Sequence, residues 1–338
     1  MVIDNNDIPK QDYMVLCSTI TYNQAPYITD TMNGFCMQQT SFSYACYIID
    51  DASTDGEQDV IKAYLDEHFQ MDKAEQYELE LANVIVAKHN TNPNCTFAVY
   101  LLKRNLWKEP DLKRPLCRPW TQRCKYIALC EGDDYWIDPH KLQKQVDFLD
   151  ANPDYSLCFH KVNIESDFYK EQKLFSHLEE RAYSDREIYE RWTIPTCSVM
   201  YRYLSAVHRK CVSPMVYGDI HLFLSLAQKG RIYCLACVGA TYRRHEGSIT
   251  QHMSSKTIIA LLQQYKSMET IFPNLIDITK QYERVYLDRL FYFQKEVKDV
   301  WKYRLWYCRL NPKLFMHPFF VITIYKYMLL PYIRKVFK

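Results

Sequence analysis

Short apolar runs alternate with helix-like segments through the first half of the chain, and this alternation restricts the fold more than any other feature. Apolar residues recur between the runs at three- and four-residue spacing, which predicts crossover helices over Tyr27–Met37, Gln58–Phe69 and Phe97–Trp107. The runs themselves read as strands and are Tyr13–Ile20, Ala45–Ile49, Val84–Ala87 and Lys125–Cys130. Strands that alternate with helices build βαβ units, so the sequence predicts an α/β fold around a mostly parallel sheet.

The second half is less regular and ends in a segment of different composition. It predicts further strands over residues 157–160 and 231–238, and helices over residues 185–192, 219–228 and 254–271. From residue 280 onward, thirteen Lys or Arg accompany four Asp or Glu, a net charge of +9, whereas the whole chain has a formal charge of +2. We therefore expect a main domain over residues 1–265 and a helical, basic and aromatic extension over residues 266–338.

Composition excludes several classes of protein. Seven glycines in 338 residues leave no Gly-rich phosphate-binding loop of the G-x-G-x-x-G or P-loop kind. The nearly balanced charge argues against a protein that binds nucleic acid through bulk positive charge. The first residues, MVIDNNDIPK, lack the basic-then-apolar layout of a secretory signal, and thirteen cysteines suit a reducing compartment. We expect a cytoplasmic protein.

Polar and acidic residues come directly after three of the predicted strands. They are Thr21-Tyr22-Asn23, the run 50–56 (DDASTDG) and the run 131–136 (EGDDYW). Ligands of open α/β sheets bind beyond the carboxyl ends of the strands, so these residues are expected to face one crevice. Acids this close raise one another's pKa unless a divalent cation or hydrogen bonds to a polar ligand offset the charge. A turn with helix-capping side chains is the alternative for residues 50–56, but capping does not explain the acids at 131–134.

The order and wording of five segments resemble the family 2 glycosyltransferases, which are nucleotide-sugar enzymes of the GT-A fold. The segments lie between about residue 13 and about residue 250 and read STITYNQAPYI, YIIDDASTDG, KYIALCEGDDYWIDPHKLQKQVDFL, YGDIHLFLSLAQKG and YRRHEGSIT. The acidic segment has Glu-Gly-Asp-Asp where many relatives have Asp-x-Asp. The resemblance implies a GT-A domain, with a Rossmann-like, mostly parallel sheet, followed here by the helical extension.

The resemblance also implies a binding site for a nucleoside diphosphate sugar. Tyr22 would stack on the base, with Thr21 and Asn23 beside it. Asp51 would accept a hydrogen bond from a ring N–H of the base, which favours uracil or thymine, and a UDP-sugar is the expected donor.

The leaving diphosphate needs positive partners, and the resemblance supplies candidates for them. Asp133 would hold the ribose, while Asp134 and His245 would bind Mn²⁺ or Mg²⁺. A structural histidine is the alternative for His245. Arg243 or Arg244 would grip the diphosphate. Since the chain has too few glycines for a phosphate loop, a metal is the remaining device that can neutralise the diphosphate.

Asp219 is the predicted general base for the acceptor hydroxyl, and a helix cap is its alternative role. A base on the face opposite the leaving group implies inversion at the anomeric carbon. Trp136 and Thr196 are expected on the acceptor side, where the Trp136 ring would present a flat apolar face to a sugar.

The C-terminal residues 312–338 combine the apolar run Phe315–Leu330 with several cations. About a dozen residues separate Pro318 from Pro331, fewer than the ~20 needed to span a bilayer. The segment suits docking on the inner face of the cytoplasmic membrane. Packing on the main domain, or on a second subunit of a homodimer, is the other hypothesis.

These features together predict an inverting, metal-dependent glycosyltransferase. It would move a sugar, from a UDP-sugar by preference, to a hydroxyl of a glycan or lipid-linked acceptor in bacterial surface-polysaccharide synthesis. A catalytically inactive, nucleotide-sugar-binding scaffold is one rival, although Asp134, Asp219 and His245 are all present. A sugar nucleotidyltransferase is a weaker rival, because it needs a Gly-rich loop near its start and residues 13–40 contain only Gly34.

Overall fold

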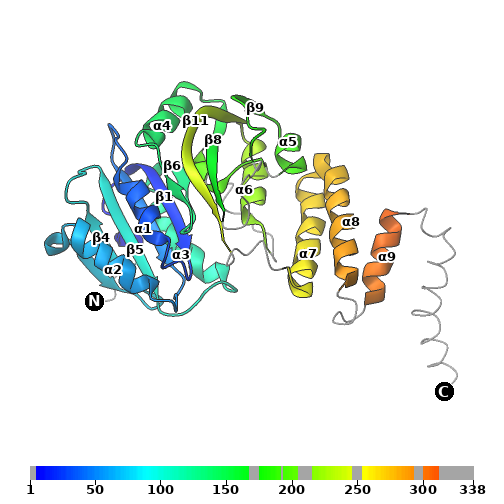
Figure 1. Cartoon of the computed structure of the whole chain (residues 1–338), viewed down its shortest axis with the longest axis horizontal. Helices are drawn as coiled ribbons and strands as arrows, with labels where there is room; N and C mark the ends of the chain where they lie inside the picture. The colour runs from blue at the N-terminus through cyan, green and yellow to red at the C-terminus, as the bar shows by residue number, and fades with distance from the viewer. Residues whose placement is uncertain are drawn as a thin grey trace, which may run out of the picture. The chain divides into compact units, whose positions relative to one another are not determined.

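The structure is a computed structural model of the chain, and it describes residues 5–166, 175–191, 193–204, 215–245, 253–292 and 300–311. The chain divides into two compact units, and Figure 1 labels many of their helices and strands. The first unit comprises residues 1–209 and 222–246, and the second comprises residues 210–221 and 247–338.

The first unit is built on one sheet, which has eleven strands within the described residues. Across the sheet they are β3 (Glu75–Glu78), β4 (Ala82–Lys88), β5 (Cys95–Leu102), β2 (Tyr44–Asp50), β1 (Tyr13–Thr21), β6 (Cys124–Leu129), β10 (Met200–Arg202), β8 (Tyr155–Ser166), β11 (Arg231–Arg244) and β7 (Tyr135–Trp136), with β9 (Arg181–Tyr183) paired to β11. Strands β5, β2, β1 and β6 are parallel, and so are β8 and β11, while β10 runs antiparallel between β6 and β8. The predicted α/β fold with a mostly parallel central sheet is confirmed.

Helices cover both faces of the parallel strands. Three of them contribute to one core on the same face: α1 (Ile28–Cys36), α2 (Glu57–His68) and α4 (Lys141–Ala151). Figure 1 shows α1 and α2 over these strands. On the opposite face, α3 (Pro110–Thr121) packs through Trp120, whose Nε1 donates to the Tyr100 hydroxyl at 2.9 Å. The unit also contains α5 (Asp185–Glu190) and most of α6 (Gly218–Ala227).

One predicted helix is wrong, because residues 95–102 form strand β5 rather than the start of a helix over Phe97–Trp107. Every residue of β5 is buried, so the strand lacks the alternation that marks a half-exposed strand. Its continuous apolar residues therefore imitate helical spacing. The helix that connects β5 to β6 is α3, further along the chain.

The second unit is helical, as predicted for the extension, but it begins earlier than expected. Its described helices are α7 (Ser255–Ile271), α8 (Ile276–Tyr292) and α9 (Val300–Leu310). The side chains of Ile258, Leu262, Leu287 and Leu290 form the shared core of α7 and α8. The predicted boundary at residue 265 falls inside α7, whereas the two units divide at residue 246.

The predicted membrane-docking segment, residues 312–338, lies outside the described residues. Among the residues that are described, no helix combines the length and the apolar character that crossing a bilayer requires. The twelve cysteines of this described part are all free thiols.

Candidate active site

Three loops meet at the carboxyl edge of the parallel strands β1, β2 and β6. Strand pairing aligns Thr21 of β1 with Asp50 of β2, and Ser18 of β1 with Leu129 of β6. Parallel strands in register end at one edge of the sheet, so the loops that follow them come together. The residues predicted to bind ligand after β1, β2 and β6 therefore gather at this edge.

Glu57, the first residue of α2, ties the loop after β1 to the loop after β2. Its buried carboxylate accepts hydrogen bonds from the Thr21 hydroxyl, the Gln24 amide at 2.8 Å and the Ser53 hydroxyl at 2.8 Å. Burial raises the pKa of Glu57 above its ordinary value, and these hydrogen bonds oppose the rise. Asn23 has φ 55°, in the left-handed region, and its amide donates to Ser53 Oγ at 2.9 Å. Thr21 is buried, so its hydroxyl holds the loop rather than facing a ligand, which corrects the predicted contact with the donor.

The two residues predicted to recognise the base have different surroundings. Tyr22 is 44% exposed, as a stacking surface requires. Asp51 is buried, with its Oδ2 2.6 Å from Lys113 Nζ and its Oδ1 accepting from the Leu106 amide at 2.7 Å. Lys113 belongs to α3, so the segment between β5 and β6 covers this carboxylate. Both Asp51 oxygens already have protein partners, so a ring N–H of a base would donate to an oxygen that also contacts Lys113 or the Leu106 amide.

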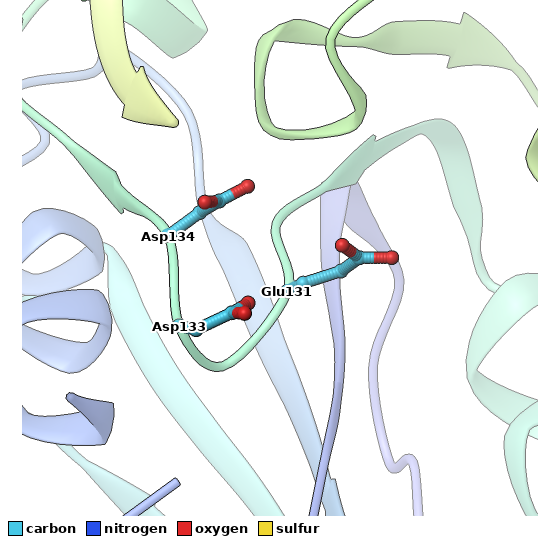
Figure 2. A group of neighbouring side chains, drawn as sticks. All are labelled: Glu131, Asp133 and Asp134. Atoms are coloured by element: carbon cyan, nitrogen blue, oxygen red, sulfur yellow. The ribbon is translucent and has the colours of Figure 1, made fainter. Parts of the chain in front are cut away.

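Glu131, Asp133 and Asp134 form an acidic cluster directly after β6 (Figure 2). One carboxylate oxygen of each residue lies within 4.8 Å of those of the other two. Glu131 is exposed, Asp133 is half-buried and Asp134 is buried. Position 132 favours glycine, because a Cβ at Gly132 would collide with the side chain of Thr21 unless that side chain moved. The loop is therefore packed directly against the end of β1.

Asp134 is held inside the protein. Its Oδ1 accepts from the Arg243 backbone amide at 2.7 Å, and its backbone oxygen accepts from the Thr31 hydroxyl of α1 at 2.6 Å. Its Oδ2 is also buried, and the Cys197 side chain is hydrogen-bonded to the carboxylate. Burial raises the pKa of Asp134 well above its ordinary value, and the neighbouring Asp133 and Glu131 raise it further.

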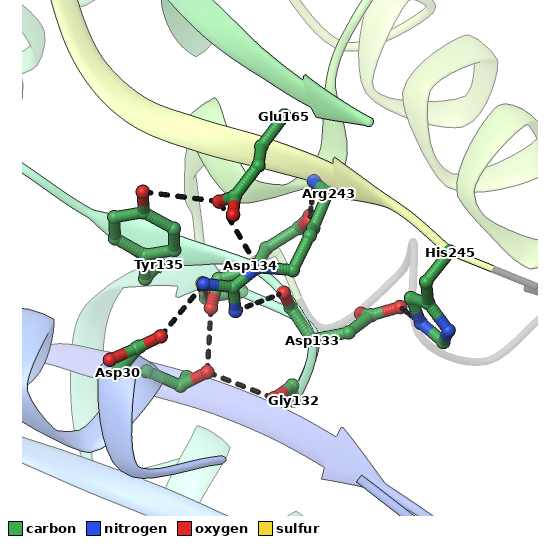
Figure 3. Close-up of polar contacts among 10 residues, drawn as sticks. Asp30, Gly132, Asp133, Asp134, Tyr135, Glu165, Arg243 and His245 are labelled. Atoms are coloured by element: carbon green, nitrogen blue, oxygen red, sulfur yellow. Dashed lines mark hydrogen bonds and ion pairs between the residues drawn. The ribbon is translucent and has the colours of Figure 1, made fainter. Parts of the chain in front are cut away.

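His245 meets Asp133 rather than Asp134. Its Nε2 lies 3.0 Å from Asp133 Oδ2, and both side chains are largely buried. The Tyr27 ring packs against the imidazole with ring centroids 4.7 Å apart. The sequence predicts His245 and Asp134 together at the metal, but in the structure the Asp134 carboxylate accepts from the Arg243 amide and His245 contacts Asp133, as Figure 3 shows.

Arg243 is engaged within the protein, which does not fit its predicted grip on the diphosphate. Its Nη2 lies 2.7 Å from Asp30 Oδ2 and its Nε lies 3.2 Å from Glu165 Oε2. The side chain of Arg243 is only 10% exposed. Arg244, the alternative that the sequence offered, is half-buried and remains the candidate for the diphosphate.

The residues predicted for the acceptor side are both buried. Trp136 is 2% exposed: its ring packs edge-on against Phe35, and its Nε1 donates to the Cys197 backbone oxygen at 2.8 Å. Lys141 Nζ lies 4.0 Å from the centre of the same ring. The prediction that Trp136 offers a flat face to a sugar is therefore wrong, because its apolar ring fills the core. Thr196 is 7% exposed, and its acceptor role stays a prediction.

Asp219 lies in the second unit, in the first turn of α6. Burial raises its pKa above the ordinary value, and a hydrogen bond from the Ile220 backbone amide opposes the rise. Gln264 of α7 fixes the chain just before this turn, because its Oε1 accepts from the amides of Val216 and Tyr217 at 2.8 and 3.1 Å. The role of Asp219 as a general base stays a prediction.

The donor atoms of the acidic cluster fit a hard divalent cation. Carboxylate oxygens with one imidazole nitrogen are ligands that Mn²⁺ and Mg²⁺ accept. Three carboxylates so close together also call for positive charge. Asp133 and His245 could hold such an ion, with Glu131 beside them.

The sequence does not single out four residues that support this site. Lys113 is one of many cations in the Pro- and Arg-rich stretch, and Asp30 and Glu165 are isolated acids on a helix and a strand. Glu57 alone carries a signal, the T-x-x-E spacing that marks a helix start, but this spacing gives no hint that Glu57 fixes two loops. Each of the four acts through a contact with a distant part of the chain.

Comparison with known proteins gives matches in sequence and in structure. Residues 18–81 match the family described as Glycosyl transferase family 2. Uncharacterized proteins of Mycobacterium bovis and Mycobacterium tuberculosis are 32% identical to the chain over 232 residues. This alignment covers 68% of the chain and 59% of each mycobacterial protein, so the chain spans about three fifths of the length of these relatives.

Two solved structures illustrate the likeness of fold. S. aureus TarS (residues 1–349, in complex with UDP-GlcNAc) superposes with a TM-score of 0.53 at 15% identity, over 83% of this chain and 73% of TarS. The mannosyltransferase PcManGT from Pyrobaculum calidifontis, in complex with GDP-Man and Mn²⁺, gives a TM-score of 0.51 at 14% identity, over 83% of this chain and 73% of PcManGT.

These matches define the class of protein. The sheet and its covering helices have the mixed α/β architecture of the GT-A fold, as predicted. The predicted resemblance to the family 2 glycosyltransferases is confirmed, and the matching residues include the end of β1, the whole of β2 and the loops that follow them.

Proposed function

We propose that the protein is an inverting, metal-dependent glycosyltransferase that uses a nucleoside diphosphate sugar, with a UDP-sugar as the favoured donor. The observation that carries this proposal is the acidic cluster at the carboxyl edge of the parallel strands, with His245 against Asp133. Structures of similar fold were solved with UDP-GlcNAc, with UDP, and with GDP-Man and Mn²⁺, which supports a nucleotide-sugar donor.

The loop after β1 would bind the nucleoside. The exposed Tyr22 ring would stack on the base, and Asn23 would keep the loop in its left-handed turn beside it. Asp51 would accept from the base N–H through one of the oxygens that it now shares with Lys113 and the Leu106 amide. A carboxylate oxygen has two lone pairs, so it can accept a second hydrogen bond without losing the first.

The acidic cluster would bind the diphosphate through a cation. A bound Mn²⁺ or Mg²⁺ would neutralise the charge that develops on the leaving diphosphate. Asp133 and His245 would hold it, so Asp133 takes the role first assigned to Asp134, and the exposed Glu131 would lie toward the ribose. Arg244 would contact the diphosphate directly.

Asp219 would remove the proton from the acceptor hydroxyl. Its pKa is raised by burial, which makes the carboxylate a stronger base than an exposed aspartate. We expect Asp219→Asn to lower kcat at least ~100-fold while donor affinity changes little. NMR of the product settles the stereochemistry, and a product that retains the anomeric configuration of the donor would contradict inversion.

The acceptor would be a glycan or a lipid-linked glycan of a bacterial surface polysaccharide. Residues 312–338 would bring the protein to the inner face of the cytoplasmic membrane, and packing on protein, including a second copy of the chain, is the alternative. Liposome co-sedimentation of the full chain and of a chain without these residues separates the two ideas. Salt-sensitive binding that needs the segment supports docking, and no binding by the full chain ends this part of the proposal.

A donor panel tests the central proposal. Purified protein with Mn²⁺ is expected to release UDP from one UDP-sugar in the presence of a glycan acceptor, and to stop after dialysis against EDTA. Donor binding without turnover for any acceptor would favour the inactive-scaffold rival. Release of pyrophosphate from a nucleoside triphosphate and a sugar phosphate would instead identify a nucleotidyltransferase.

A further inference from the structure

Arg243, near the end of β11, connects the acidic cluster to two other elements of the first unit (Figure 3). Its backbone amide holds the Asp134 carboxylate, and its Nη1 donates to the Asp133 backbone oxygen at 3.1 Å. The other two nitrogens of the guanidinium meet Asp30 of α1 and Glu165 of β8. Arg243 thus contacts both aspartates, Asp134 through its backbone amide and Asp133 through its side chain, and the side chain is anchored to α1 and β8.

Aromatic rings hold the same guanidinium in place. Its carbon lies 4.6 Å from the ring centre of Tyr135 and 5.0 Å from that of Tyr27. The Tyr135 hydroxyl donates to Glu165 at 3.3 Å, so this acid anchors both the guanidinium and the ring. Tyr27 also packs against His245. Arg243 and His245, two residues apart in sequence, therefore pack against the same Tyr27 ring.

We infer that Arg243 is a positioning residue that assembles the cation site before the cation arrives. The inference rests on the proposed function, in which Asp133 and His245 hold the cation. The acidic cluster would otherwise open through mutual repulsion of its carboxylates. Arg243 binds the backbone of Asp133 and the side chain of Asp134, which leaves the Asp133 carboxylate to face His245 and the ligand.

The geometry requires arginine at this position. The guanidinium reaches three acceptors in different directions within one plane, and its flat faces rest on two tyrosines. A lysine at the same place has one nitrogen and no flat face, so it keeps the charge but loses most of these contacts. Arg243→Lys is therefore a conservative change in charge and a large change in positioning.

The experiment compares Arg243→Lys with its neighbour, Arg244→Lys, in the full chain. Free Mn²⁺ is measured by EPR titration without nucleotide, and UDP binding is measured by calorimetry at saturating Mn²⁺. Arg243→Lys should weaken Mn²⁺ binding roughly 10- to 100-fold, as loss of a supporting partner of a metal ligand does. Its UDP affinity at saturating Mn²⁺ should stay within about threefold of the wild type, since the site re-forms around the ion. Arg244→Lys should give the opposite pattern.

Two milder variants guard against a folding defect in Arg243→Lys. Asp30→Asn and Glu165→Gln each remove one anchor of the guanidinium, and both acids are about half exposed. Each should weaken Mn²⁺ binding in the same direction by a smaller factor, with melting temperatures near the wild type.

Normal Mn²⁺ affinity in Arg243→Lys overturns the inference, whatever the UDP affinity of this variant. If its Mn²⁺ affinity is normal and its UDP affinity is reduced, Arg243 instead contacts the diphosphate directly. If that variant does not fold, normal Mn²⁺ affinity in the Asp30→Asn, Glu165→Gln double variant overturns it. The activity and the inference can fail separately, because wild-type protein that binds Mn²⁺ but transfers no sugar removes the proposed function and still allows this test.

Discussion

Two acidic loops lie at the same edge of the sheet, and their carboxylates have different environments. In the loop after β2, Asp51 pairs with Lys113, and the buried Glu57 that follows it accepts three hydrogen bonds. In the acidic cluster after β6, three carboxylates crowd together, with one oxygen of each within 4.8 Å of those of the other two. The acids after β2 thus build structure, whereas we propose that the acidic cluster presents its carboxylates to a cation. Acidity alone does not distinguish these roles, but the partners of each carboxylate do.

Removal of the carboxylate that faces His245 should have the largest effect. Asp133→Ala is expected to lower turnover at least about 1000-fold, because a bound cation contributes several kcal/mol to a phosphate leaving group. Turnover and Mn²⁺ affinity should fall together in this variant. Asp66→Ala, an exposed acid on α2, is the matched control and should retain both. Normal turnover by Asp133→Ala would show that the acidic cluster is not the cation site.

Removal of the Lys113 ammonium group, which pairs with Asp51, should lower the stability of the fold more than it affects the metal site. Lys113→Met leaves a buried carboxylate with only the Leu106 amide, and the free energy of unfolding should fall by about 3 kcal/mol. Urea denaturation measures the change, and Mn²⁺ affinity of the folded variant should stay normal. A stable variant with weak Mn²⁺ binding would reverse the distinction between the two loops.

A methyl group at the junction of the loops should affect both. In Gly132→Ala the new Cβ meets the Thr21 side chain, whose hydroxyl is bonded to Glu57. Overpacking of this kind lowers the free energy of unfolding by roughly 1–3 kcal/mol. Thermal melting and Mn²⁺ titration should both change. Gly56→Ala, which is strained by its positive φ of 91° and has open space around its Cβ, should lower the melting temperature and leave the Mn²⁺ titration unchanged.

The smallest effect concerns pH and Glu57. Its folded-state pKa lies above the ordinary value of 4.5, so the folded chain keeps a proton that the unfolded chain has already released. The folded state then binds more protons, and its stability falls as pH rises from near 4.5 through the raised pKa. Glu57→Gln should remove this contribution. Urea midpoints across this pH range should fall less steeply for the variant, and equal slopes would contradict the expectation.

Much of the fold follows from local sequence patterns. Strands β1, β2 and β6 are short apolar runs followed by polar residues, and the sequence places all three. The sequence does not predict strand β5, because both faces of this strand are buried and its residues do not alternate between apolar and polar. Composition also fails to mark where the two units divide. The basic composition begins after α7, whereas the units divide before that helix.

The candidate site divides in the same way. The acids at 131–134 and His245 follow strands directly, so their position in sequence predicts their place at the edge of the sheet. Lys113 is 62 residues from Asp51, and Arg243 is 213 residues from Asp30, and no local pattern records such contacts. No local pattern predicts the burial of Trp136 either. It depends on Gly34, far away in sequence, whose missing side chain lets α1 approach Trp136.

The short segment from the end of β1 into α1 carries Tyr22 before the helix and Thr31 within it. The Thr31 hydroxyl contacts the backbone oxygens of Gly132 and Asp134 at 3.0 and 2.6 Å, so α1 grips the acidic cluster. A nucleotide that stacks on Tyr22 and a cation bound at the acidic cluster would then both order the segment from the end of β1 into α1. Bound UDP and bound Mn²⁺ would be cooperative, and linkage requires each to raise the affinity of the other by the same factor. The protein would bind either component weakly alone and would select the donor as an assembled nucleotide–metal complex.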